Sequence, residues 1–202
     1  MQNKHLQEIH EEACIKSSGT LARLIGGQAI VDIVNPRVKK LKELTPTIGP
    51  NKAVAIVCLP VSGKVEGAAL LMFSPKTAFD LSDLLIKKAP GTTKELDELD
   101  KSALEELGNI ICGSYFTTIS NHTGIKMVER APRLSFDTLE TRLEQTIGKL
   151  TQNHKDVVAL ETEFNFTVPA FKGHLFKSYF LVLFQTRHLE AILDSLQKTP
   201  AI

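Results

Sequence analysis

The chain repeats one order of secondary-structure elements, and this repeat limits the folds it can adopt more than any other feature. Apolar spacing and turn residues predict a helix, a strand, a connection, a hairpin and a helix over residues 4–88, and the same order over residues 96–198. Identical residues recur 98 positions apart at Glu8 and Glu106, Cys14 and Cys112, Thr20 and Thr118, and Gly26 and Gly124. Together, the order and the identities indicate an internal duplication.

Turn and capping residues set the expected limits of these elements. The first helix covers residues 4–25 and stops at Gly26-Gly27, and a strand over 28–34 follows, limited by Pro36. Residues 37–51 are expected to form an exposed connection. The remaining expected elements are hairpins over 53–61 with 65–73 and 156–168 with 174–184, helices over 74–88, 95–124, 138–152 and 186–198, and a broken strand over 125–136.

These elements predict an α+β fold. All of residues 1–202 are expected to form one domain made of two structural repeats. The repeats would share a central antiparallel sheet about a pseudo-two-fold axis, with the two long helices packed as a pair. Because the hairpin strands are apolar throughout, we expect the sheet to be partly covered on both faces.

Composition excludes several classes of function. The net charge is +1, which gives no electrostatic basis for binding nucleic acid or an acidic membrane. The three cysteines are scattered and odd in number, which suits a reducing cytoplasm, and no segment resembles a signal peptide or a membrane span. None of the six histidines has a metal-ligand spacing with the cysteines, so we expect no metal site in this chain.

The second long helix separates a polar stripe from an apolar face. With Ser102 placed at zero, Glu106 falls at about 40°, Asn109 at about −20° and Gly113 at about 20° around an ideal helix. The residues on the opposite side are apolar or aromatic: Leu104, Leu107, Ile111 and Tyr115.

Gly113 is a costly residue for this position. A glycine in a helix interior costs about 1 kcal/mol relative to alanine, and on an outer stripe that cost gains no core packing. One explanation is a docking face that another backbone must approach closely. The alternative is an ordinary solvent-exposed helix face, on which polar residues such as glutamate are common.

The stripe carries a family signature. Ser102, three residues, Glu106, two residues, Asn109, then 22 residues and Pro132 resembles the motif of the CheC/CheX/FliY phosphatases, in which Asp or Ser occupies the first position. The duplicated organisation also resembles CheC-like proteins, which are built of two related halves, so the resemblance covers nearly the whole chain.

The resemblance implies a function in chemotaxis or another two-component system. The substrate would be the aspartyl phosphate of a CheY-like response-regulator receiver domain, whose own site holds Mg²⁺ and a lysine, so the chain itself would need no cofactor. Asn109 would orient the attacking water and Glu106 would pair with the receiver lysine. Ser102, Gly113 and Pro132 would support the site without a chemical step.

The first half departs from this motif. Glu8 matches Glu106, but Glu11 stands where Asn109 stands, Lys4 replaces Ser102 and Val34 replaces Pro132. An ionised Glu11 cannot donate a hydrogen bond and would add negative charge near a phosphoryl group. We therefore expect a degenerate first site and one active face, on the second helix.

Two alternatives remain open at this stage. A non-catalytic member of the same group would bind the regulator as an adaptor or flagellar-switch component without hydrolysing its phosphate. An unrelated α+β binding module would carry the motif by chance. The exposed hairpin edges also allow a homodimer.

Overall fold

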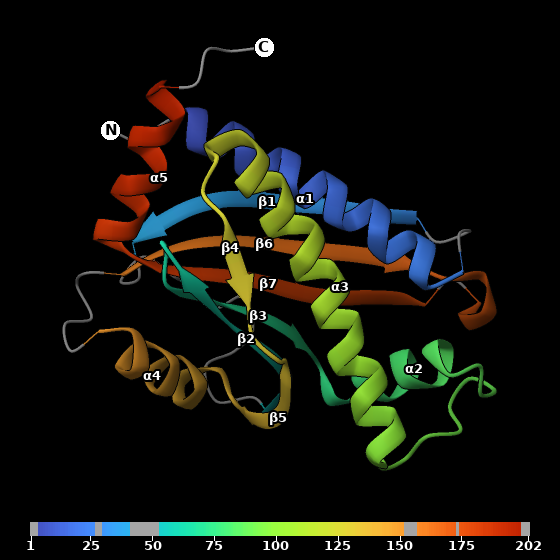
Figure 1. Ribbon diagram of the computed structural model, residues 1–202. Coiled ribbons are helices and arrows are strands. Elements are labelled where there is room, and N and C mark those ends of the chain that lie inside the picture. The colour runs from blue at the N-terminus through green and yellow to red at the C-terminus, as the bar shows by residue number, and fades with distance from the viewer. Residues whose placement is uncertain (1–3, 27–29, 41–52, 152–156, 173, 199–202) are drawn as a thin grey trace.

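The computed structural model describes residues 4–26, 30–40, 53–151, 157–172 and 174–198 (Figure 1). Its helices are α1 (Lys4–Leu24), α2 (Pro75–Leu85), α3 (Glu98–Thr123), α4 (Leu139–Leu150) and α5 (Thr186–Lys198), with a 3-10 helix, η3 (Pro169–Phe171). Its strands are β1 (Ile30–Lys40), β2 (Ala53–Gly63), β3 (Gly67–Phe73), β4 (Met127–Glu129), β5 (Arg133–Thr138), β6 (Val157–Thr167) and β7 (Leu175–Gln185).

The strands form one antiparallel sheet with a symmetric order. That order is β1-β6-β7-β3-β2-β4, and β5 also pairs with β2. Exchanging β1 with the β4/β5 pair, β2 with β6 and β3 with β7 reverses the order and leaves it otherwise unchanged, so a pseudo-two-fold axis passes between β3 and β7. The predicted α+β fold with a central antiparallel sheet is confirmed. That residues 1–202 form a single domain of two repeats, 4–88 and 96–198, stays a prediction.

Both faces of the sheet are covered, as the apolar hairpins predicted. The larger core lies between the sheet and helices α1, α2, α3 and α5. A smaller core lies on the opposite face, where Leu139 and Ile147 of α4 pack against Val54 and Ile56 of β2. The two long helices, α1 and α3, run across one side of the sheet (Figure 1).

Burial along α1 and α3 follows the 98-residue repeat. The buried residues of α1 are Leu6, Ile9, His10, Ala13, Cys14, Ser17, Ser18 and Leu21. Their equivalents 98 positions later are all buried in α3: Leu104, Leu107, Gly108, Ile111, Cys112, Tyr115, Phe116 and Ile119. The pattern extends the duplication well beyond the four identities that the sequence shows.

The expected end of the first strand was wrong. β1 continues past Pro36 to Lys40, and its register against β6 shifts between Val34 and Arg37. A proline lacks the N–H that a continuous ladder needs, and an irregularity on an edge strand accommodates it. Residues 37–40 of the expected connection are therefore strand, and 41–51 lie outside the described residues.

Among the residues that the structure describes, no helix combines the length and the apolarity needed to cross a membrane.

Candidate functional site

Helix α3, which carries the predicted site residues, begins at a reciprocal cap. The Asp97 carboxylate accepts a hydrogen bond from the Asp100 N–H at 2.9 Å, and the Asp100 carboxylate accepts one from the Asp97 N–H at 3.1 Å. Two backbone donors of the first turn are thus satisfied, which limits fraying at this end of the helix.

Asp100 also joins the start of α3 to the α2 side of the molecule. Its Oδ1 accepts hydrogen bonds from Ser82 Oγ at 2.5 Å and from Lys88 Nζ at 2.8 Å. Burial by itself would raise the pKa of Asp100, but the hydrogen bonds from Lys88, Ser82 and the Asp97 backbone lower it to about 2. The carboxylate is therefore charged at neutral pH and fixes the first turn of α3.

Hydrogen bonds between α1 and α3 hold the two helices as a pair. Ser17 Oγ donates to the Ile111 carbonyl at 3.2 Å. His10 Nε2 lies 3.1 Å from the Glu161 carbonyl, which can only accept, so Nε2 donates and the Tyr115 hydroxyl donates to Nδ1 at 2.8 Å. Burial lowers the pKa of His10 to about 4, so this neutral tautomer persists at physiological pH.

Gly108 lets α3 lie close against the sheet. A Cβ at this position would stand 2.6 Å from Val57 Cγ1 of β2, closer than side chains can pack. The helix therefore packs directly against β2, and the opposite side of α3 faces away from the sheet.

The predicted stripe lies on that outward side. Ser102 and Glu106 are exposed, and Asn109 and Gly113 are half-buried. The four apolar or aromatic residues expected on the opposite side are all buried: Leu104, Leu107, Ile111 and Tyr115.

Glu106 and Asn109 contact each other directly. Asn109 Nδ2 donates to Glu106 Oε2 at 3.4 Å, which is long for such a bond and therefore weak. A stronger hydrogen-bonding partner for Glu106 can therefore replace this contact at little cost in free energy. With Nδ2 directed at the carboxylate, the amide oxygen of Asn109 points elsewhere and can accept a hydrogen bond from a water molecule.

The gap expected beside this pair is present. A Cβ added at Gly113 would meet no atom of another residue within 4 Å in the described structure. Packing against the described residues thus does not require glycine here, unlike at Gly108.

Pro132 lies between β4 and β5, and a side chain of α3 holds the segment that follows it. Glu105 Oε1 accepts a hydrogen bond from the Leu134 N–H at 2.8 Å. Glu105 is adjacent to Glu106, so the Pro132 segment is fixed directly to the helix turn that carries the motif. Sequence reasoning missed Glu105, and the only signal for it was its place next to Glu106 in the motif.

The corresponding face of α1 differs in three ways. Glu8 forms an ion pair with Lys4 at 3.6 Å and lies 3.5 Å from His5 Nδ1 on its own helix. Glu11 accepts a hydrogen bond from Gln7 at 2.8 Å. Ile15, which stands 98 positions before Gly113, is 61% exposed and closes the gap that α3 leaves open. Ile15 was not among the residues that the sequence pattern singled out.

The remaining titratable groups of the described residues form no second centre. Cys14 and Cys112 are buried; burial raises the pKa of the Cys14 thiol to about 12 and holds that of the Cys112 thiol well above its usual value. His122 Nε2 contacts Glu12 of α1 at 2.9 Å, and Gly124 caps the end of α3. No group of three or more His, Cys, Asp or Glu residues suited to a metal ion occurs among the described residues.

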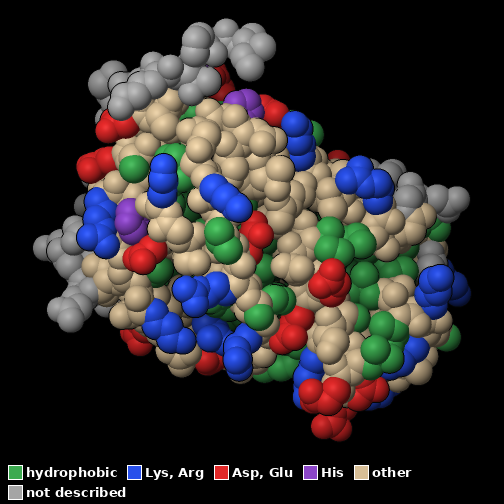
Figure 2. Space-filling model, in the orientation of Figure 1, with side chains coloured by type: hydrophobic (Ala, Val, Ile, Leu, Met, Phe, Trp, Pro, Cys, Tyr) green, Lys and Arg blue, Asp and Glu red, His purple; other side chains and the backbone are tan. Residues whose placement is uncertain are grey.

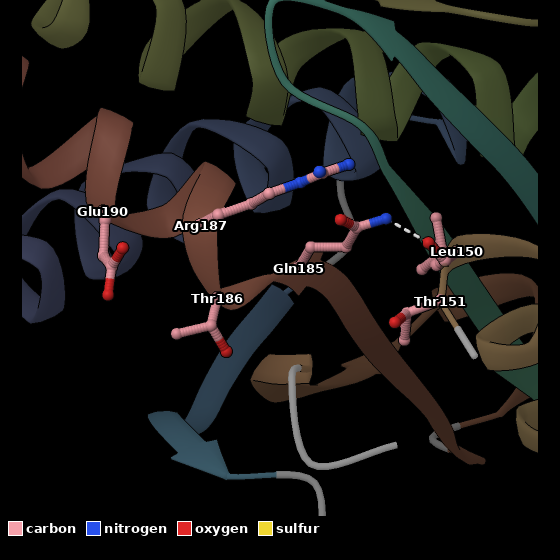
Figure 3. Close-up of a pocket in the computed structure, with 6 residues that line it drawn as sticks. All are labelled: Leu150, Thr151, Gln185, Thr186, Arg187 and Glu190. Atoms are coloured by element: carbon pink, nitrogen blue, oxygen red, sulfur yellow. Dashed lines mark hydrogen bonds between the residues drawn. The ribbon is translucent and has the colours of Figure 1, made fainter. Parts of the chain in front are cut away.

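A pocket of about 420 Å³ lies elsewhere, where α4 and β7 end and α5 begins (Figure 3). Its lining residues are Leu150, Thr151, Gln185, Thr186, Arg187 and Glu190. Gln185 Nε2 donates to the Leu150 carbonyl, and the Arg187 side chain extends toward the side of the pocket that Leu150 lines (Figure 3). None of the predicted site residues lines it, so the candidate site is a surface on α3 and not this pocket.

Comparison with known proteins points to the same helix. Residues 99–135, which span Ser102 to Pro132, match the model of the CheC-like family. The CheY-P phosphatase CheC of Bacillus subtilis (strain 168) is 23% identical over 160 residues, covering 78% of this chain and 77% of that protein.

Two solved structures have the same fold over nearly the whole chain. FliY of Thermotoga maritima has a TM-score of 0.71 at 21% identity, and the match covers 96% of this chain and 95% of the FliY chain. The FliM middle domain of H. pylori has a TM-score of 0.63 at 10% identity, and the match covers 95% of this chain and 96% of the FliM chain. The resemblance to the CheC/CheX/FliY group is confirmed: this chain has the fold of FliY and carries the CheC-like segment on its second long helix.

Proposed function

We propose that this protein is a phosphatase that hydrolyses the aspartyl phosphate of a CheY-like receiver domain. The observation that carries the proposal is the exposed pair of Glu106 and Asn109 beside the open position at Gly113. The similarity to CheC supports the same activity, because that relative is a CheY-P phosphatase.

The reaction needs one well-placed water. Its oxygen attacks phosphorus, the bond from phosphorus to the aspartyl oxygen breaks, and the products are the free aspartate and inorganic phosphate, which takes the proton that the water loses. Asn109 would hold that water through its amide, and Glu106 would leave its weak contact with Asn109 to pair with a receiver lysine. Positioning and electrostatics would supply most of the rate gain.

The divalent ion belongs to the substrate in this scheme. The receiver would bring Mg²⁺ to its own aspartates, and this chain would hold neither metal nor cofactor. A receiver domain acts in the cytoplasm, which is the location we propose for this protein.

A phosphate-release assay tests the proposal. The receiver domains encoded by the same organism are phosphorylated with a small phosphodonor, and the decay of each is followed with and without the protein. Acceleration by the wild-type chain is expected, with a higher KM and a lower rate for Glu106→Ala. Receivers that all decay at their intrinsic rate would contradict the proposal.

A second candidate is a receiver-binding adaptor without activity, as in a flagellar switch. Its support is the shared fold with the FliM middle domain and the altered motif on α1. Binding of a receiver without faster decay would favour this role.

A further inference from the structure

The N-terminal half of α3 presents apolar side chains next to the motif. Resting on the proposed function, we propose that the receiver docks over this half of the helix, with Leu99 and Phe136 as its apolar anchors on either side of Ser102.

Leu99 continues the stripe toward the start of the helix. The positions 99, 102, 106, 109 and 113 are separated by 3, 4, 3 and 4 residues, the spacing of one helix face. Leu99 lies about 60° from Ser102 around the helix axis. It is 62% exposed, so a protein laid along Glu106 and Asn109 toward the start of α3 would cover it.

The start of α3 is rigid enough to hold such an anchor. The first turn of a helix commonly frays, because its N–H groups have no partner within the helix. Here Asp97 and Asp100 cap the turn on both sides of Leu99, and Lys88 and Ser82 bind the Asp100 carboxylate. An exposed leucine fixed in this way loses little conformational entropy when a partner covers it.

Phe136 reaches the same region from the sheet. It pairs with Ala55 of β2, which belongs to the core beneath the helices, so Phe136 is on the helix side of the sheet. The other end of β2 pairs Gly63 with Met127, three residues beyond the Gly124 cap of α3. Phe136 therefore lies toward the start of α3, and it is 47% exposed.

The other half of α3 is less open to a partner. Helix α3 contacts α5, which Figure 1 places near the C-terminal end of α3, and His122 in this half lies 2.9 Å from Glu12 of α1. Figure 1 shows this half running beside α1, whereas the first half stands next to α2 and β5. Hydrophobic side chains reach the surface in the lower right of Figure 2, where Figure 1 places α2 and the first half of α3.

Charge favours a receiver over a second copy of this chain. Acidic side chains gather at the lower edge of Figure 2, where α3 begins. Asp97 and Glu106 belong to this end of the helix, and Glu98 there is paired with Lys101 at 2.7 Å. Two copies meeting here about a two-fold axis would bring these carboxylates together, which is unfavourable. A receiver site with a lysine and a divalent cation complements them.

The test compares apolar truncations of matched exposure. Leu99→Ala and Phe136→Ala remove the proposed anchors, and Leu175→Ala removes a side chain that is 48% exposed at the start of β7. Affinity is measured by calorimetry for the organism's own CheY-like receiver, activated with beryllofluoride and Mg²⁺. Turnover of the phosphorylated receiver is measured in parallel.

We expect a Kd about 10-fold higher for Leu99→Ala and for Phe136→Ala, with kcat unchanged and with no effect of Leu175→Ala. Wild-type affinity in both anchor variants would overturn the docking proposal, even where phosphate release is normal. Receiver binding that depends on Leu99 without any phosphate release would support the docking and refute the phosphatase. Loss of self-association in Leu99→Ala, with no receiver bound by the wild type, would assign the patch to a second copy and overturn the proposal.

Discussion

Replacing Gly113 with alanine should raise stability and lower activity together. Alanine in a helix interior is about 1 kcal/mol more favourable than glycine. The added methyl meets no atom of another described residue within 4 Å, so no clash offsets this gain. For a chain of this size, about 1 kcal/mol raises Tm by about 2–4 °C, which a thermal melt followed by circular dichroism resolves.

The same methyl would stand where the receiver must approach. Forcing a methyl into a packed contact costs about 1–3 kcal/mol, which is about 5- to 150-fold in kcat/KM for the phosphorylated receiver. Gly113→Ile, which reproduces the Ile15 found at the equivalent place on α1, should lower kcat/KM further.

Two other helical glycines provide matched controls. A Cβ at Gly19 of α1 or Gly148 of α4 also meets nothing within 4 Å. Gly19→Ala and Gly148→Ala should therefore share the gain in Tm and keep wild-type kcat/KM. A stabilised Gly113→Ala protein with full activity would refute the idea that the gap accepts a partner.

Further predictions concern the elements that hold α3 in place. Asp100→Ala should lower the free energy of unfolding by about 3 kcal/mol, because it breaks an ion pair in which Asp100 is buried and Lys88 is partly exposed. A urea titration measures this loss. A loss under about 1 kcal/mol would argue against a stabilising role for the Asp100 contacts. Since the pKa of Asp100 is about 2 in the fold and 3.8 ordinarily, its contribution to stability is complete above pH 3.8 and lost as pH falls to 2, and Asp100→Asn should lack this part of the pH dependence. Gly108→Ala should destabilise by about 1–3 kcal/mol, since its methyl would strike Val57, and an unchanged Tm would show that α3 can move off the sheet.

Most of the fold could be predicted because local signals were strong. Ser74 caps α2, Gly124 ends α3, and the apolar hairpins pair as their patterns indicated. The strand that crosses Pro36 could not be predicted, because a shift of register depends on the partner strand and not on the local sequence.

The site was predictable only in part, for a similar reason. Helical periodicity placed Glu106 and Asn109 on the outer face of α3, because the apolar side of that helix is unambiguous. The bond from Leu134 to Glu105 joins positions 29 residues apart, and the bonds of Asp100 reach Ser82 and Lys88. Such contacts arise from packing between elements, so a periodic pattern carries no signal for them.

The central claim is that the Asn109 amide positions the attacking water. The most direct test compares three proteins: the wild type, Asn109→Ala and Glu11→Ala. For each, the rate of phosphate release is measured at a saturating concentration of the phosphorylated receiver. The account predicts a loss of about 100-fold for Asn109→Ala, with receiver affinity retained, and a normal rate for Glu11→Ala. A wild-type rate in Asn109→Ala, or an equal loss in Glu11→Ala, would contradict it.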